Sequence, residues 1–187
     1  MAKSKSKFKS GTLLLADPFM MDAYFRRGVI LICDVHSEGT LGFILNKPLD
    51  VNINDIVSDF PSFESTVYYG GPVQTDTVHF LHTLGDFIDD SVYVSNGVYW
   101  GGDFEKLKVL INKEMVLPDQ VKFFVGYTGW SAGQLEDELD TGSWVLYEMD
   151  PNYLFLIKHD KLWQTAMLHK GNNHAVIGQM PDILNLN

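Results

Sequence analysis

The chain has 187 residues and carries a formal net charge of −10 at pH 7, with a sequence pI near 4.8. Hydrophobic residues make up 45% of it, so it is too apolar for a disordered chain and long enough to bury a core without disulfides or metals. The acidic balance opposes binding to a phosphate backbone, and no apolar run reaches the roughly 18 residues of a membrane span. We therefore expect a cytoplasmic protein without nucleic-acid or membrane partners.

The first ten residues carry four interspersed lysines and read as a disordered basic tail, followed by one domain over residues 11–187. An electrostatic arm for nucleic acid or anionic lipid is the alternative for this tail. The lone cysteine, Cys33, excludes an internal disulfide and fits a reducing compartment. It lies in the apolar run VILICDV and reads as a buried small hydrophobe.

Branched and aromatic residues in the first half of the chain predict several strands, separated by turns such as HSEG and GGPV. The Asn96-Gly97 pair between two β-prone runs indicates a type I′ hairpin. A short helix capped by Asn52 or Asn54 is expected before Pro61. The expected strands are residues 11–16, 28–35, 40–47, 65–71, 77–83 and the two arms of 91–100.

In the second half of the chain, the spacing of apolar residues alternates between that of helices and that of strands. Asp103 precedes the clearest helix, on which Phe104, Leu107 and Ile111 share one face. Further helices are expected over 131–140 and 161–170, the latter ending at Gly171, with strands over 120–127 and 143–149. Residues 153–160 are ambiguous. Together these elements predict an α+β fold with a mixed, mainly antiparallel sheet.

The segment GWSAG, residues 129–133, matches the nucleophile elbow G-x-S-x-G between an expected strand and an expected helix. Ser131 is thus a candidate nucleophile, with Asp150 or Asp160 and with His82 or a C-terminal histidine as partners. The competing interpretation is a helix start, in which Ser131 and Gln134 form a capping box while Trp130 and Leu135 form a hydrophobic staple. Only 56 residues follow Ser131, which is short for the rest of a hydrolase sheet, so we favour the cap.

Other patterns carry little chemistry. His79 and His82 are three residues apart on an expected strand, so they point to opposite faces and cannot share a metal ion. Neither a Walker A motif nor G-x-G-x-x-G is present, and we predict no metal site and no cofactor.

Turn residues gather at element junctions, at Asn46-Lys47-Pro48, Gly70-Gly71-Pro72 and Gly129-Trp130. Backbone geometry explains such clusters, because glycine and proline set the φ angles of tight turns. The alternative is a binding surface, since loops on a rigid scaffold carry many binding residues.

Four ordered segments resemble the YqgE/AlgH family of bacterial proteins: residues 11–49, YYGGPV, FLH and GYTGWSAGQLEDEL. The resemblance implies an α+β fold with a bifurcated sheet bent into a pseudo-barrel and flanking helices, and no established catalytic activity. Some members are labelled putative transcriptional regulators. In the family pattern the position of Ser131 is commonly a small residue and need not be serine. The matching positions are Asp22, Phe25, His36, Gly39, Gly42, Asn46, Gly70, Gly71, Pro72, Val73, His82, Gly129, Trp130, Gly133, Gln134, Leu135 and Glu136.

These observations lead to the hypothesis of a non-enzymatic binding or regulatory protein with an unknown protein or small-molecule partner. Its expected binding surface comprises Asn46, Gly71, Pro72, Trp130, Gln134 and Glu136. A serine hydrolase using Ser131 is the first alternative, and direct action on DNA is the second.

Overall fold

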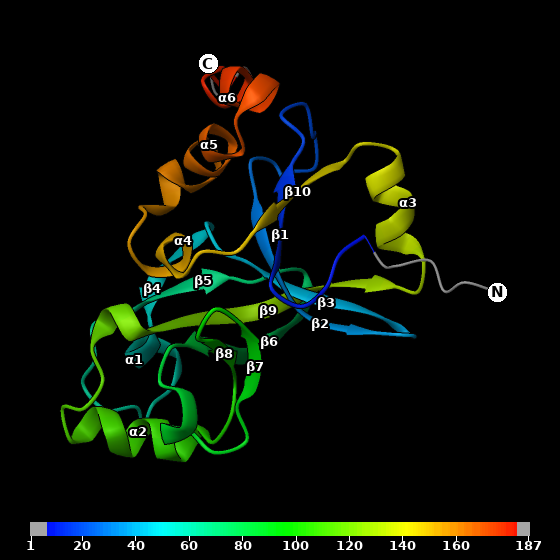
Figure 1. Cartoon of the computed structure of the whole chain (residues 1–187). Coiled ribbons are helices and arrows are strands. Elements are labelled where there is room, and N and C mark those ends of the chain that lie inside the picture. Colours follow the sequence, from blue (N-terminus) through cyan, green and yellow to red (C-terminus); the bar gives the residue numbers. More distant parts are fainter. Residues whose placement is uncertain (1–6, 183–187) are drawn as a thin grey trace.

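The computed structural model describes residues 7–182. Ten strands form one branched sheet, and its main path runs β10-β1-β2-β3-β9-β6-β8-β7 (Figure 1). Nearly all neighbours are antiparallel, and the parallel pair is β5 with β9. The strand bounds are β1 Thr12–Ala16, β2 Val29–His36, β3 Gly39–Ile44, β4 Pro48–Asn52, β5 Thr66–Tyr69, β6 Val73–His82, β7 Val92–Ser95, β8 Val98–Trp100, β9 Val121–Ser131 and β10 Trp144–Glu148.

The branch lies at β9, the longest strand. Its first half pairs with β5 on one side and β6 on the other, while its last four residues pair with β3. This forked pairing lets the sheet curl into a half-barrel, which confirms the mixed, mainly antiparallel and bifurcated sheet predicted from the sequence.

Glycines make the fork possible. Gly71 has a φ of 153°, and a Cβ on it would collide with the backbone of Tyr127 in β9. Gly126, with a φ of 65°, approaches Gly71 from the other side, where a Cβ would collide with the Gly71 carbonyl oxygen. The Gly70-Gly71 pair therefore allows the backbone before β6 to approach the backbone of β9 closely, because no larger residue fits there.

Helices cover the sheet in three places (Figure 1). The short α1 and the longer α2 lie over the end formed by β6–β8, α3 follows β9, and α4 to α6 lie along the opposite side. No helix in the described range 7–182 is long and apolar enough to cross a bilayer. The helix bounds are α1 Ile53–Ile56, α2 Phe104–Asn112, α3 Gln134–Asp140, α4 Pro151–Phe155, α5 His159–Lys170 and α6 Asn172–Gly178, with 3-10 turns η1 Gly85–Phe87 and η2 Pro118–Gln120.

The core has three clusters because the central strands are buried on both faces. Leu13 and Leu15 of β1 pack with helix α5, whereas Leu14 faces the cluster that holds Trp130 and Leu135. The third cluster lies under α2 and includes Leu107. Burial on both faces explains why β1 and β2 read as continuous apolar runs rather than as alternating ones.

Most predicted elements are confirmed. Asn96 and Gly97 both have positive φ, as a type I′ turn requires, and the Asp103 carboxylate accepts from the Lys106 backbone N–H at 3.0 Å. The ambiguous segment contains the end of α4 and the start of α5. Strand β4 and helix α6 were not predicted, and the helix expected over 52–60 is only α1.

The first six residues of the expected basic tail lie outside the described residues. The following four pack against the body of the protein. Phe8 is buried beside the Trp130 cluster, Lys7 pairs with Asp140, and the Ser10 hydroxyl donates to the Cys33 carbonyl at 2.9 Å. Lys7, Phe8 and Ser10 thus each contact the folded body.

Candidate functional site

The six residues of the expected binding surface lie at different places. Asn46 follows β3, where its amide oxygen accepts from the Val29 N–H at 2.9 Å and its NH₂ donates to the Arg27 carbonyl at 2.8 Å. Trp130 lies opposite Thr40 at the other end of β3. Asn46 is six positions along the chain from Thr40, which corresponds to about 20 Å of extended backbone. Asn46 thus fixes the start of β2 and does not adjoin Trp130.

The junction of β9 and α3 is a closed hydrogen-bond network around a residue that the sequence did not single out. Glu138 accepts from the Trp130 indole at 2.9 Å and from the Trp144 indole at 2.7 Å, both through Oε2. Its other oxygen, Oε1, accepts from the Gln134 amide at 3.0 Å. Trp130 and Trp144 are 5% and 6% exposed and meet edge to face. The network ties helix α3 to two strands.

Ser131 is the last residue of β9, and α3 begins only at Gln134, with Gly133 as its N-cap. The predicted capping box is therefore only half formed. The Gln134 amide oxygen accepts from the Ser131 backbone N–H at 3.1 Å and from its hydroxyl at 3.3 Å. The predicted N-cap position of Ser131 was wrong because β9 continues through the turn, where it pairs with Gly39.

All six histidines lie in the described part of the chain, and none is a hydrogen-bond partner of the Ser131 hydroxyl. His82 is buried on β6, where its Nε2 hydrogen-bonds to the Gly101 carbonyl at 3.0 Å and its Nδ1 accepts from the Leu84 N–H at 3.2 Å. Burial lowers the pKa of this imidazole. His79 lies on the other face against Phe43 and Trp100, so the two histidines diverge as the strand period predicts.

A groove of about 670 Å³ lies beside Trp130, between the β2–β3 hairpin and β9. Tyr127 contributes aromatic surface, the largely buried Trp130 adds little to it, and the exposed hairpin contributes His36 and Glu38. His36 Nε2 is 2.6 Å from the carboxylate of Asp34, which also lines the groove. Of the expected surface, Trp130 lines this groove, and Pro72 is exposed next to the lining residue Val73.

Gln134 and Glu136 belong to α3, and neither lines this groove. Gln134 is held by the Glu138 network, and Glu136 is exposed in the first turn, where the helix dipole favours a negative charge. The groove residues Asp34 and Glu38 were not among the predicted site residues. Glu38 lies in the polar segment HSEG, which also reads as a simple turn, and Asp34 lies in the strand run VILICDV.

Comparisons with known proteins agree with this architecture. A sequence profile described as AlgH-like matches residues 13–175. A UPF0301 protein of Chlorobaculum parvum is 41% identical over 179 residues, covering 96% of each chain. Another from Chlorobium phaeobacteroides is 38% identical over the full length of both chains.

Two solved structures share the fold. The solution structure of the AlgH protein from Pseudomonas aeruginosa superposes with a TM-score of 0.74 at 25% identity, covering 97% of this chain and 98% of that one. A crystal structure of a protein from Corynebacterium diphtheriae gives a TM-score of 0.78 at 21% identity, covering 96% of each chain. The likeness to the second structure concerns the fold alone.

Proposed function

The chain belongs to the AlgH-like family, and from this premise we propose that it is a non-enzymatic cytoplasmic protein that binds a partner protein through the groove beside Trp130. The observation that carries the proposal is the groove itself. It combines open volume, an aromatic wall and a floor that the Glu138 network holds rigid. Rigid, pre-formed grooves lose little entropy when a partner binds.

The charge of the groove indicates the kind of partner. Asp34 and Glu38 line it, and the whole chain carries a net charge of −10. A partner segment with Lys or Arg beside an apolar or aromatic residue would match both the carboxylates and the Tyr127 wall. The same carboxylates repel phosphate, so we expect no binding to duplex DNA even at low salt.

Two further features support this proposal. The lone Cys33 is buried, and burial raises its thiol pKa, so it is a poor nucleophile and suits a reducing cytoplasm. The Ser131 hydroxyl donates to Gln134 rather than to an imidazole among the described residues. A serine hydrolase needs a base within hydrogen-bond reach of its nucleophile, and no imidazole in the range 7–182 is hydrogen-bonded to the Ser131 hydroxyl.

The proposal can be tested by changing the groove at its exposed hairpin, where folding is least affected. Ser37→Trp would obstruct the groove, and Glu38→Lys would reverse its charge. Asp86 is an exposed acidic residue in η1, and Asp86→Lys is the matched charge control. We expect each groove variant to capture at least about tenfold less partner than the wild type. The control should capture as much as the wild type.

Capture that is equal for all four proteins would show that this groove is not the binding surface. Capture by the wild type should also weaken as salt rises, because charge pairing at an exposed groove is screened.

A further inference from the structure

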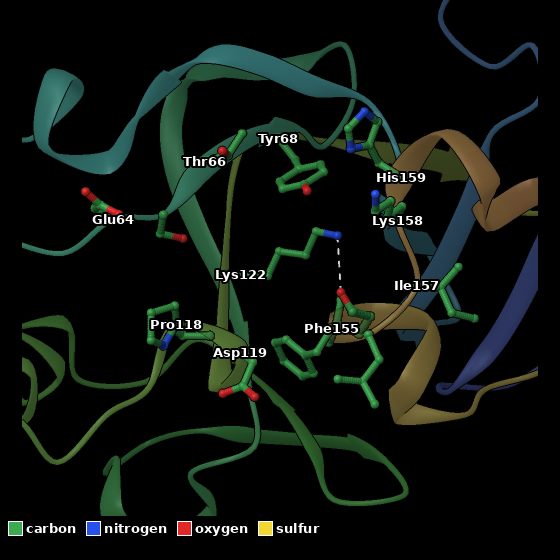
Figure 2. Close-up of a pocket in the computed structure, with 14 residues that line it drawn as sticks. Glu64, Thr66, Tyr68, Pro118, Asp119, Lys122, Phe155, Ile157, Lys158 and His159 are labelled. Atoms are coloured by element: carbon green, nitrogen blue, oxygen red, sulfur yellow. Dashed lines mark hydrogen bonds between the residues drawn. The ribbon is translucent and has the colours of Figure 1, made fainter.

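A second cavity lies at the opposite end of β9 from Trp130 (Figure 2). Its volume is about 320 Å³, at the lower end of the range for small-molecule sites. Three segments line it: residues 64–68 around β5, residues 118–122 at the start of β9, and residues 154–159 between α4 and α5. None of these segments takes part in the groove beside Trp130.

Lys122 extends into this cavity from the floor of the sheet (Figure 2). The residue is only 7% exposed. Its Nζ donates to the Leu154 carbonyl at 3.2 Å and lies 3.8 Å from the centre of the Tyr68 ring. Strand alternation explains this direction, because Lys122 shares a face with Phe124, which also packs on Tyr68.

The Lys122 amine has fewer partners than a buried cation requires. An ammonium has three N–H donors, and here one carbonyl and one ring face meet it. Lys122 forms no ion pair with any residue in the range 7–182. Lysines are almost never buried without a counter-ion, and residues 7–182 supply none for Lys122. Burial lowers the pKa of this amine to about 7.

The wall facing the amine also favours an anion. Figure 2 shows the amine pointing toward Lys158 and His159 and away from Glu64 and Asp119. Lys158 is the N-cap of the 12-residue helix α5, and no side chain caps the first N–H groups of that helix. A helix start with free N–H groups carries a partial positive charge.

The remaining lining limits the charge and shape of the ligand. Glu64 and Asp119 lie on the wall and oppose a multiply charged group such as phosphate. The three segments contain neither arginine nor glycine, the residues that usually build phosphate cradles. Pro118, Leu156 and Ile157 offer apolar surface for an organic body.

We propose that this cavity binds a small organic monocarboxylate, whose carboxylate pairs with the Lys122 ammonium while its apolar body contacts the α4–α5 wall. Binding takes up a proton where the amine was neutral, because the carboxylate stabilises the charged form. The site is independent of the groove proposed for the partner protein.

The test is NMR titration of the full chain, labelled in its lysine side chains and backbone amides, with acetate, butyrate, hexanoate and inorganic phosphate. We expect affinity to increase from acetate to hexanoate, by roughly threefold to fourfold for each buried methylene. The shifted amides should map to residues 64–68, 118–122 and 154–159. Bound hexanoate should raise the pKa of the Lys122 amine by about one unit or more.

Two variants separate the role of Lys122 from general effects. Lys122→Met should reduce hexanoate affinity at least about tenfold, because the charged partner is lost. Lys106→Met, at an exposed position on α2, should leave affinity unchanged. Because the wild-type titration maps the site directly, the result does not depend on how well Lys122→Met folds.

Either of two results would overturn the proposal. One is the absence of shifts in the three segments at about 10 mM hexanoate, a concentration that would reveal even millimolar affinity. The other is phosphate binding as tight as hexanoate binding, which would show that the cavity does not select carboxylates.

Discussion

The two ends of strand β9 differ in how fully their buried polar groups are paired. At the Trp130 end, two indoles and one amide all donate to Glu138, so each polar group in that cluster is satisfied by the protein. At the Lys122 end, a buried amine meets one carbonyl and a ring face, and no carboxylate of the described residues pairs with it. Eight residues of one strand, about 26 Å, separate the two environments.

This difference distinguishes a structural polar cluster from a candidate ligand site. A saturated network adds stability and rigidity, and it leaves no donor for a ligand. An under-paired buried cation costs stability, and such a cost persists where a function uses the group. The eye-catching motif, GWSAG, lies at the saturated end, whereas the under-paired amine lies in a segment without any motif.

The largest effect is expected where the network is broken. Glu138→Ala removes a charged acceptor from three donors and leaves two buried indoles unpaired. We expect a loss of about 3–5 kcal/mol in the free energy of unfolding, measured by urea denaturation. Glu136→Ala on the same helix is the control and should change it by less than about 0.5 kcal/mol. Equal losses for both variants would contradict the structural role of Glu138.

At the Lys122 end, we expect the buried amine to lower the free energy of unfolding when it is charged. The pKa of Lys122 is about 7 in the folded protein. In the unfolded chain it is about 10.4, so the unfolded state binds more protons between these values. Stability should therefore rise with pH across this window, by up to about 1.4 kcal/mol per unit, relative to Lys122→Met. Parallel pH profiles for wild type and Lys122→Met would refute a depressed pKa.

His82 gives a smaller effect in a lower pH window, because it is buried but well paired. Burial lowers its pKa in the folded protein, so the unfolded chain takes up the proton first as pH falls below about 6.5. Stability should thus decline below that pH, and less steeply in His82→Gln than in the wild type. His36→Gln, at an exposed histidine, is the control. Urea unfolding at about pH 7.5 and pH 5.5 measures both slopes.

Ser131→Ala should have the smallest effect, about 0.5 kcal/mol, because its hydroxyl is exposed and its 3.3 Å bond to Gln134 is long. The purified wild type should not react with a fluorophosphonate serine probe. Labelling that disappears in Ser131→Ala would establish an activated serine and reverse our interpretation of this end of β9.

Local patterns predicted the parts of the fold that depend on neighbouring residues. Asn96-Gly97 turns as its positive φ preference requires, Asp103 caps α2, and Gly171 ends α5 with a φ of 75°. The same logic failed at Ser131, because pairing of β9 with β3 extends the strand past the position where local capping would start a helix. Strand β4 was missed because its exposed face and Pro48 give no strong strand pattern.

The candidate site was less predictable than the fold. Of the predicted surface residues, Trp130 lines the groove, Gln134 does not, and Asn46 lies at the other end of β3, since distance along the chain does not report which turns meet in space. In the sequence, Glu138 is one of several neighbouring carboxylates in EDELD, and no motif distinguishes it. Its role depends on two indoles, one of which comes from the following strand.

The sequence by itself determined the composition-driven properties of this protein: a folded acidic body, an α+β alternation of elements, its turns and helix ends, and its family. Only the folded structure places β9 between β3, β5 and β6, joins Glu138 to two tryptophans, and brings Lys122 into a cavity where no residue of the described range 7–182 forms an ion pair with it. The physical reason is the range of the interactions. Turns and caps depend on residues within one helical turn, whereas burial and charge pairing depend on segments that only the folded sheet brings together.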